Sequence, residues 1–234
     1  MKIFALLITI VLASSILGLA QDQSVFESVY AETDPRLDTD PNSAFWVHAR
    51  SIDAAVDAQG TAVAELSTQV RSRWTKDGLY FLFTCPYKHL YVKPSPSVDT
   101  ETYALWNWNV AEVFIGSDYQ NIKRYKEFEV SPQNEWVDLD IDLDSPHHED
   151  GWKWNSGFEH RARIDAASHV WYVAMRIPFA AVTSVTPTAG TTFRINFYRT
   201  EGSPKDAREV MWRPTRSKTF HVPESFGELK LVKK

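Results

Sequence analysis

The feature that most constrains the fold is a succession of about ten short apolar or alternating runs, each bounded by Gly, Pro, Asn, Asp or Ser. No stretch repeats apolar residues at helical spacing for long enough to form a long amphipathic helix. The pattern therefore predicts an all-β fold, an antiparallel, jelly-roll-like β-sandwich formed by residues 21–234 as one domain. The expected strands are residues 69–74, 79–85, 110–116, 124–131, 135–144, 158–165, 169–177, 191–200, 209–212 and 228–232, with a lead-in strand within residues 21–33 and a short turn or helix near Phe179.

The clearest local signal is a hairpin between residues 70 and 85. A weakly alternating run and a mostly apolar run flank the sequence Lys76-Asp77-Gly78. An Asp-Gly step readily adopts the positive φ angles that a tight hairpin needs. We therefore expect Asp77 and Gly78 to form the turn with such angles.

The first twenty residues have the composition of an export signal. Lys2 supplies a positive start, residues 3–19 are apolar, and Gly18-Leu19-Ala20 has the small-x-small pattern of a cleavage site. No stop-transfer pattern follows, and no Cys lies near the cleavage point for a lipid anchor. We expect residues 1–20 to be a cleaved signal peptide and the mature protein to be secreted or periplasmic, without stable membrane insertion.

The charge of the mature chain argues against two classes of partner. Cleavage removes Lys2 and no acid, so 24 of the 25 Lys and Arg remain against 30 Asp and Glu, a net charge of 24 − 30 = −6. An acidic chain without a basic stripe is not expected to bind nucleic acid or anionic membranes. Cys85, the only cysteine, lies in an apolar run and is expected to be a buried, unreactive thiol.

The stretch from residue 102 to 132 holds the side chains best suited to bind a ligand. Trp106 and Trp108 lie in an Asn-rich segment without helical or strand period, just before an apolar run that carries Glu112. An indole packs on the apolar face of a sugar ring, and a carboxylate accepts hydrogen bonds from hydroxyls, so the combination suits a polyol. The structural alternative is that both indoles cap the open end of the sandwich.

Two further groups could hold a metal ion. Asp138, Asp140, Asp142 and Asp144 alternate with aliphatic residues, which predicts a solvated strand face over a buried one. Stacked oxygen ligands also suit Ca²⁺, so structural calcium is the alternative, but no EF-hand spacing assigns its ligands. The adjacent His147 and His148 lack a third ligand at matching spacing, so the metal site stays unknown.

Six short motifs follow one another from about Asp34 to the C-terminus. They are Asp-Gly-Leu-Tyr-Phe-Leu-Phe at 77–83, Trp-x-x-x-x-Ala-Glu-Val-Phe-Ile at 106–115, Tyr-Lys-Glu-Phe-Glu-Val-Ser-Pro at 125–132, Met-Arg-Ile-Pro-Phe at 175–179, Phe-Arg-Ile-Asn-Phe-Tyr-Arg at 193–199 and Phe-His-Val-Pro-Glu-Ser-Phe-Gly at 220–227. In this order they resemble the family 9 carbohydrate-binding modules and family 9-like exported proteins, a DOMON-like sandwich. Each motif is short, but six in register cover nearly the whole mature chain.

The resemblance implies a sandwich that binds saccharides without catalysis, with a terminal sugar held between two tryptophans and structural Ca²⁺ elsewhere. It implies that Trp106 is the first stacking residue and Glu112 the hydroxyl acceptor. Phe220 stands in the place of the second tryptophan. Arg199 and Arg208 lie in segments where the family places polar residues that face the ligand.

Several positions depart from the family pattern. Phe220 covers less of a sugar ring than an indole does. Ser217 stands in place of the family's Asn, and Asn109 in place of an acid, and each lost polar partner costs on the order of 1 kcal/mol. His221 could contribute to the site or fix the last turn.

The predicted function is non-catalytic binding of a glycan end or oligosaccharide. One alternative is a fold that was retained while sugar binding was lost. Another is a haem-binding, DOMON-type electron-transfer domain with Met175 or Met211 as a ligand, although Met175 is more easily explained as core. A third is a glycosidase that uses Glu127 and Glu129, which share a strand face.

Overall fold

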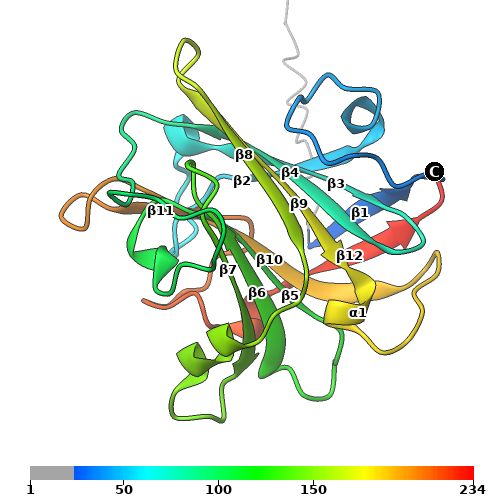
Figure 1. Ribbon diagram of the computed structural model, residues 1–234. Helices are drawn as coiled ribbons and strands as arrows, with labels where there is room; N and C mark the ends of the chain where they lie inside the picture. The colour runs from blue at the N-terminus through cyan, green and yellow to red at the C-terminus, as the bar shows by residue number, and fades with distance from the viewer. Residues whose placement is uncertain (1–23) are drawn as a thin grey trace, which may run out of the picture.

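The computed structural model describes residues 24–234, so the expected signal peptide lies outside the described residues. These residues form twelve strands (Figure 1). The strands are β1 (Val25–Tyr30), β2 (Arg50–Ala54), β3 (Thr68–Trp74), β4 (Gly78–Pro86), β5 (Ala111–Gly116), β6 (Arg124–Val130), β7 (Trp136–Asp142), β8 (Glu159–Asp165), β9 (Val170–Pro178), β10 (Thr192–Glu201), β11 (Arg208–Met211) and β12 (Gly227–Val232).

The helices of the described residues are short, and none has the length and apolar composition needed to cross a membrane. The helix α1 (Phe179–Val182) begins where the sequence predicts a short turn or helix. The 3₁₀ helices are η1 (Trp46–His48), η2 (Ala64–Leu66), η3 (Leu105–Asn107), η4 (His148–Lys153) and η5 (Pro223–Ser225).

The strands pair in the order β7-β6-β5-β10-β12-β1-β3-β4-β9-β8, with β11 beside β10 and β2 beside β3. This path folds over, so that β8 and β9 pass in front of β10 in Figure 1. Between the two layers, the ring of Phe81 on β4 lies 5.4 Å from that of Phe197 on β10. The predicted all-β sandwich is confirmed.

Purely antiparallel pairing, however, is wrong at one strand. β1 is the expected lead-in strand, but it pairs in parallel with both β12 and β3. Among the described residues, the next strand after β1 is β2, which does not pair with it, so no hairpin turn after β1 fixes its direction. The sequence prediction also missed β2, because Arg50–Ala54 contains a single large apolar residue and pairs with β3 alone among the strands.

The hairpin predicted between residues 70 and 85 is present as β3 and β4, but its glycine has a different purpose. The amide of Thr75 donates to the carbonyl oxygen of Gly78 at 3.0 Å, and neither Asp77 nor Gly78 has a positive φ. A Cβ at Gly78 would lie 2.6 Å from the carbonyl oxygen of Ile177 on β9. Glycine is therefore required for the close approach of two strands.

The strands β5, β6 and β10 each serve two apolar layers, because successive side chains point to opposite faces. One face supplies Val113 and Phe197 to the core between the sheets. The other supplies Phe114, Tyr125 and Tyr198 to a second cluster, which also takes in the aliphatic face of β7. This second cluster supports the pocket described below.

Two residues singled out by the sequence lie in the core as expected. Cys85 and Met175 are both fully buried there. Burial raises the pKa of the Cys85 thiol to about 12, so the thiol stays protonated and unreactive.

The aspartates in and after β7 have protein partners. Asp138 is buried and accepts hydrogen bonds from the backbone N–H of Ser156, at 3.0 Å, and from its hydroxyl. The other three form ion pairs at 2.5 Å: Asp140 with Lys126, Asp142 with Arg124, and Asp144 with Lys123. Three of the four aspartates therefore have a basic partner, whereas Asp138, expected on a solvated face, is buried.

Candidate functional site

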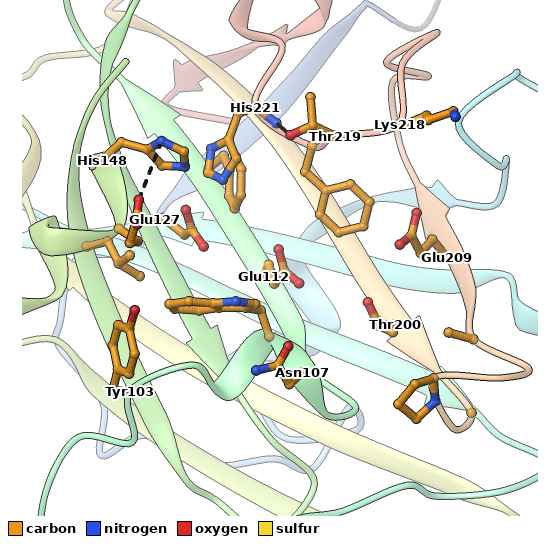
Figure 2. Close-up of a pocket in the computed structure, with 18 residues that line it drawn as sticks. Tyr103, Asn107, Glu112, Glu127, His148, Thr200, Glu209, Lys218, Thr219 and His221 are labelled. Carbon is orange, nitrogen blue, oxygen red and sulfur yellow. Dashed lines mark hydrogen bonds and ion pairs between the residues drawn. The ribbon is translucent and has the colours of Figure 1, made fainter. Parts of the chain in front are cut away.

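A pocket of about 600 Å³ opens over the face of β5, β6 and β10 that carries the second cluster (Figure 2). This volume is typical of small-molecule sites. Figure 2 shows Glu112 near the centre, with Asn107 of η3 on one side and Thr219 and His221 on the other. Side chains from widely separated parts of the chain therefore meet at one place.

The helix η3 directs one of the two candidate tryptophans to the pocket. Ala104 precedes it with φ of 60°, a left-handed conformation that costs a non-glycine residue roughly 1–2 kcal/mol. Within the helix, the Leu105 side chain is buried, whereas Trp106 lines the pocket. Trp108 instead stacks on Tyr91, with ring centroids 4.6 Å apart. The two indoles thus separate into a pocket residue and a packing residue.

On the other side of the pocket lies a second aromatic residue, Phe220. Its ring stacks on Tyr198 with centroids 4.4 Å apart, and the Tyr198 hydroxyl donates to its carbonyl oxygen at 3.0 Å. The next residue, His221, has its Nδ1 2.6 Å from the Tyr125 hydroxyl. Burial, together with the nearby His148, lowers the pKa of His221 to about 4, so its ring is neutral near pH 7.

Three buried carboxylates, those of Glu112, Glu127 and Glu129, come together, and the first two line the pocket. Glu112 and Glu129 are directly paired across β5 and β6, and Glu127 lies two positions along β6 on the same face. Burial raises the pKa of Glu112 well above its usual range, with the charges of Glu127 and Glu209 adding to the shift. Burial raises the pKa of Glu127 to about 7. For Glu129 burial again dominates, and repulsion from Glu112 and Glu127 adds to the rise in pKa.

The two arginines expected to face the ligand do not line this pocket. Arg199 is 1 % exposed, and it donates hydrogen bonds at 3.3 Å to the Leu66 carbonyl oxygen and the Thr68 hydroxyl. It also forms an ion pair with Glu201 at 3.5 Å. Arg208 pairs with Glu201 as well, at 3.7 Å. Because Thr200 of β10 lines the pocket, its neighbour Arg199 must point to the opposite face.

The family's polar positions are also structural in this chain. The Asn109 side chain accepts a hydrogen bond from the Tyr91 amide at 2.7 Å and donates one to the Gly202 carbonyl oxygen at 3.0 Å. It therefore ties together two loops beside the pocket. Ser217 does not line the pocket.

Sequence reasoning missed several lining residues, among them Thr200, Glu209 and His148. Alternation along β10 was a usable signal, since it places Thr200 on the same face as Tyr198. Glu209 reaches the site only because β11 pairs Glu209 with Thr200, a register that the sequence does not display.

The chain matches the sequence model of a family described as "Carbohydrate family 9 binding domain-like" over residues 38–234. A protein of Arthroderma benhamiae named "Extracellular protein" is 25% identical over 157 residues, which span 62% of this chain and 69% of that protein.

Two solved proteins share the fold. One is a family 9 carbohydrate binding module of Caldicellulosiruptor kristjanssonii, 15% identical, solved with glucose (TM-score 0.66, covering 90% of this chain and 96% of that chain) and with cellotriose (TM-score 0.65, covering 90% and 94%). The other is a protein of Bacteroides uniformis proposed to bind carbohydrate, also 15% identical (TM-score 0.70, covering 88% and 98%). At this identity, the likeness to both establishes the fold.

Proposed function

Because the chain belongs to the carbohydrate family 9 binding domain-like family, we propose that it binds a saccharide in the pocket of β5, β6 and β10, without catalysing a reaction. The observation that carries this proposal is that Trp106 and Phe220 line one pocket together with the buried carboxylates of Glu112 and Glu127. Apolar ring faces next to strong hydrogen-bond acceptors match the mixed surface of a sugar.

Each component has a distinct task in this proposal. Trp106 provides the larger platform for the apolar face of the sugar ring. Phe220 provides a smaller one, and its stacking on Tyr198 holds it in place. Glu112 and Thr200 offer oxygen atoms to the hydroxyls. Arg199 and Arg208 are not part of the proposed site, because both are engaged with Glu201.

The test is titration of the mature protein with glucose and cellotriose, the ligands of the solved relative. Tryptophan fluorescence and calorimetry measure the binding. We expect a saturable signal whose affinity falls at least about tenfold in Trp106→Ala, equivalent to about 1.4 kcal/mol. Trp108→Ala is the matched control, since this indole packs on Tyr91 outside the pocket, and it should change affinity less than about threefold.

The competing function, a retained fold without sugar binding, predicts the opposite outcome. A flat titration with these sugars and a broader oligosaccharide panel, from protein shown to be folded by circular dichroism, would contradict our proposal. If Trp106→Ala and Trp108→Ala lost sugar affinity equally, the binding site would not be the pocket proposed here.

We also propose that the protein is exported. The signal-like composition of residues 1–20 and the relative named "Extracellular protein" both support this. N-terminal sequencing of the protein from the culture medium or periplasm should begin at Gln21, and retention of the chain inside the cell would contradict export.

A further inference from the structure

The buried acids of the described residues fall into two groups. One group has partners close by: Glu135 with Lys93 at 3.6 Å, Glu201 with Arg199 at 3.5 Å, and Asp138 with Ser156. The other group consists of Glu112, Glu127 and Glu129. Within residues 24–234 no Lys, Arg or His forms an ion pair with any of these three.

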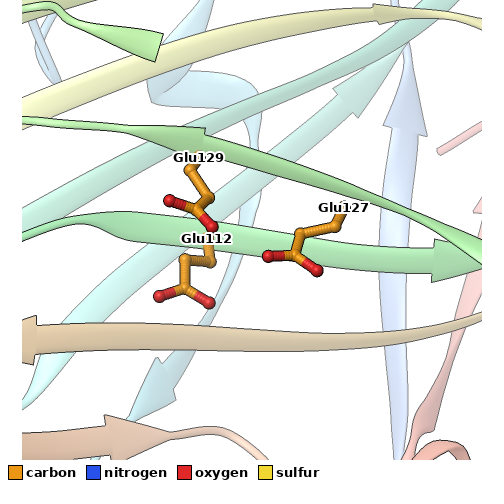
Figure 3. Close-up of side chains that lie close together, drawn as sticks. All are labelled: Glu112, Glu127 and Glu129. Carbon is orange, nitrogen blue, oxygen red and sulfur yellow. The ribbon is translucent and has the colours of Figure 1, made fainter. Parts of the chain in front are cut away.

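The three unpaired carboxylates converge. Their side chains project from β5 and β6 to the same face (Figure 3), and one oxygen from each lies within 4.8 Å of the others. All three residues are buried, at 2 %, 4 % and 0 % exposed for Glu112, Glu127 and Glu129. Both carboxylate oxygens of Glu129 and Oε2 of Glu127 have no hydrogen-bond partner in the described part of the chain.

An ionised carboxylate is costly to bury without a partner, so these three acids either keep their protons or face a cation. We propose that Glu112, Glu127 and Glu129 bind a divalent cation, Ca²⁺, at the floor of the pocket. The ligands are all carboxylate oxygens, which suits a hard cation, whereas zinc sites in proteins are usually built from Cys and His. Two paired strands, β5 and β6, each with a neighbour on both sides, fix the positions of all three ligands.

The number of protein carboxylates favours calcium over magnesium. Magnesium gives up its water reluctantly and is usually held by one or two carboxylates, whereas calcium takes about six to eight oxygen ligands in flexible geometry. Three carboxylates whose nearest oxygens lie within 4.8 Å of one another therefore suit the larger ion better.

The proposed ion would be open toward the pocket. Glu112 and Glu127 line the pocket, and Glu129 does not. Three carboxylates offer at most six oxygens, whereas calcium takes about six to eight, so pocket water or sugar hydroxyls could complete its shell. This last step alone rests on the proposed function; the cation site itself does not.

The test is calorimetric titration of the mature, EDTA-treated protein with CaCl₂, and with MgCl₂ for comparison. We expect one calcium ion per chain, weaker binding of magnesium, and at least a tenfold loss of calcium affinity in Glu129→Gln and in Glu127→Gln. Asp140→Asn is the matched control, because this acid lies on the neighbouring strand and is already paired with Lys126. It should bind calcium within about threefold of the wild type.

Two results would overturn the cation site: a folded wild type that gives no saturable calcium binding, or Gln variants that bind calcium as well as the wild type does. Parallel sugar titrations in calcium and in EDTA separate the two proposals. Calcium binding without sugar binding supports the cation site and contradicts the saccharide function. Sugar binding without calcium binding supports the saccharide function and contradicts the cation site.

Discussion

Two sets of acids on adjoining strands of one sheet have opposite surroundings. At β7 and just beyond it, Asp140, Asp142 and Asp144 each pair with a basic side chain in or next to β6. On β5 and β6, three glutamates lie together without one. Strand alternation separates the two sets, because Lys126 points to the face of Asp140 and Glu127 to the other. The net charge of the chain is therefore less informative than the charge of each face.

The largest expected effect tests the unpaired set. In EDTA at neutral pH, we expect Glu129→Gln to raise the free energy of unfolding by about 1–3 kcal/mol. Burial raises the pKa of Glu129 in the folded protein, so folding at neutral pH must protonate this acid or bury its charge, and a neutral amide avoids that cost. Urea denaturation of the wild type and the variant measures the difference.

Excess calcium should reverse that order, because the wild type alone would gain stability from binding the ion. A variant that is less stable than the wild type in EDTA would show that the glutamates are satisfied by some other means, and it would remove the contrast between the two sets.

The sequence predicted the features that depend on local periodicity. Alternation and turn residues located the pocket strands β5, β6 and β10, and motif order indicated Trp106 and Glu112, which do line one pocket. These signals can be interpreted from the sequence because each belongs to a single short segment. Pairing between distant segments carries no comparable signal, so the parallel partners of β1 were not foreseen.

The errors in the site have the same origin. Arg199 was expected to face the ligand, but successive side chains of a strand point to opposite faces, and it is Tyr198 that points into the second cluster, on the pocket side. Glu127 and Glu129 were recognised as sharing a face. The third glutamate, Glu112, lies beside them only because of the register of β5 on β6, which pairs Glu112 with Glu129. Register depends on packing that the sequence of one strand does not contain.

A partly buried histidine on β8, His160, extends the comparison to a group that stays uncharged near neutral pH. His160 has its Nδ1 3.2 Å from Oδ1 of Asn134, and its ring lies 5.2 Å from that of Trp136. Burial lowers its pKa from 6.5 to about 4. Between these pH values the unfolded chain binds a proton that the folded protein does not, so stability falls as the pH drops from 6.5 toward 4.

We expect His160→Gln to reduce this acid sensitivity. The loss of unfolding free energy between about pH 7 and pH 5 should be smaller in the variant by about 1–2 kcal/mol. Denaturant melts of both proteins at the two pH values measure it. Parallel losses in the wild type and variant would show that His160 titrates normally when folded.

The smallest effect is expected in the paired set, and it tests whether the ion pairs of β7 stabilise the sheet. Lys126 is 21 % exposed, pairs with Asp140 and lies 4.4 Å from the ring centre of Trp154, so Lys126→Ala should cost about 0.5–1 kcal/mol. Lys123, at 53 % exposed, pairs with Asp144, and Lys123→Ala should cost less than about 0.5 kcal/mol. Thermal melts of both variants at low and high salt measure these costs. If the two substitutions cost the same and the cost disappears at high salt, the pairs only neutralise the acidic face, and the comparison then rests on the unpaired glutamates alone.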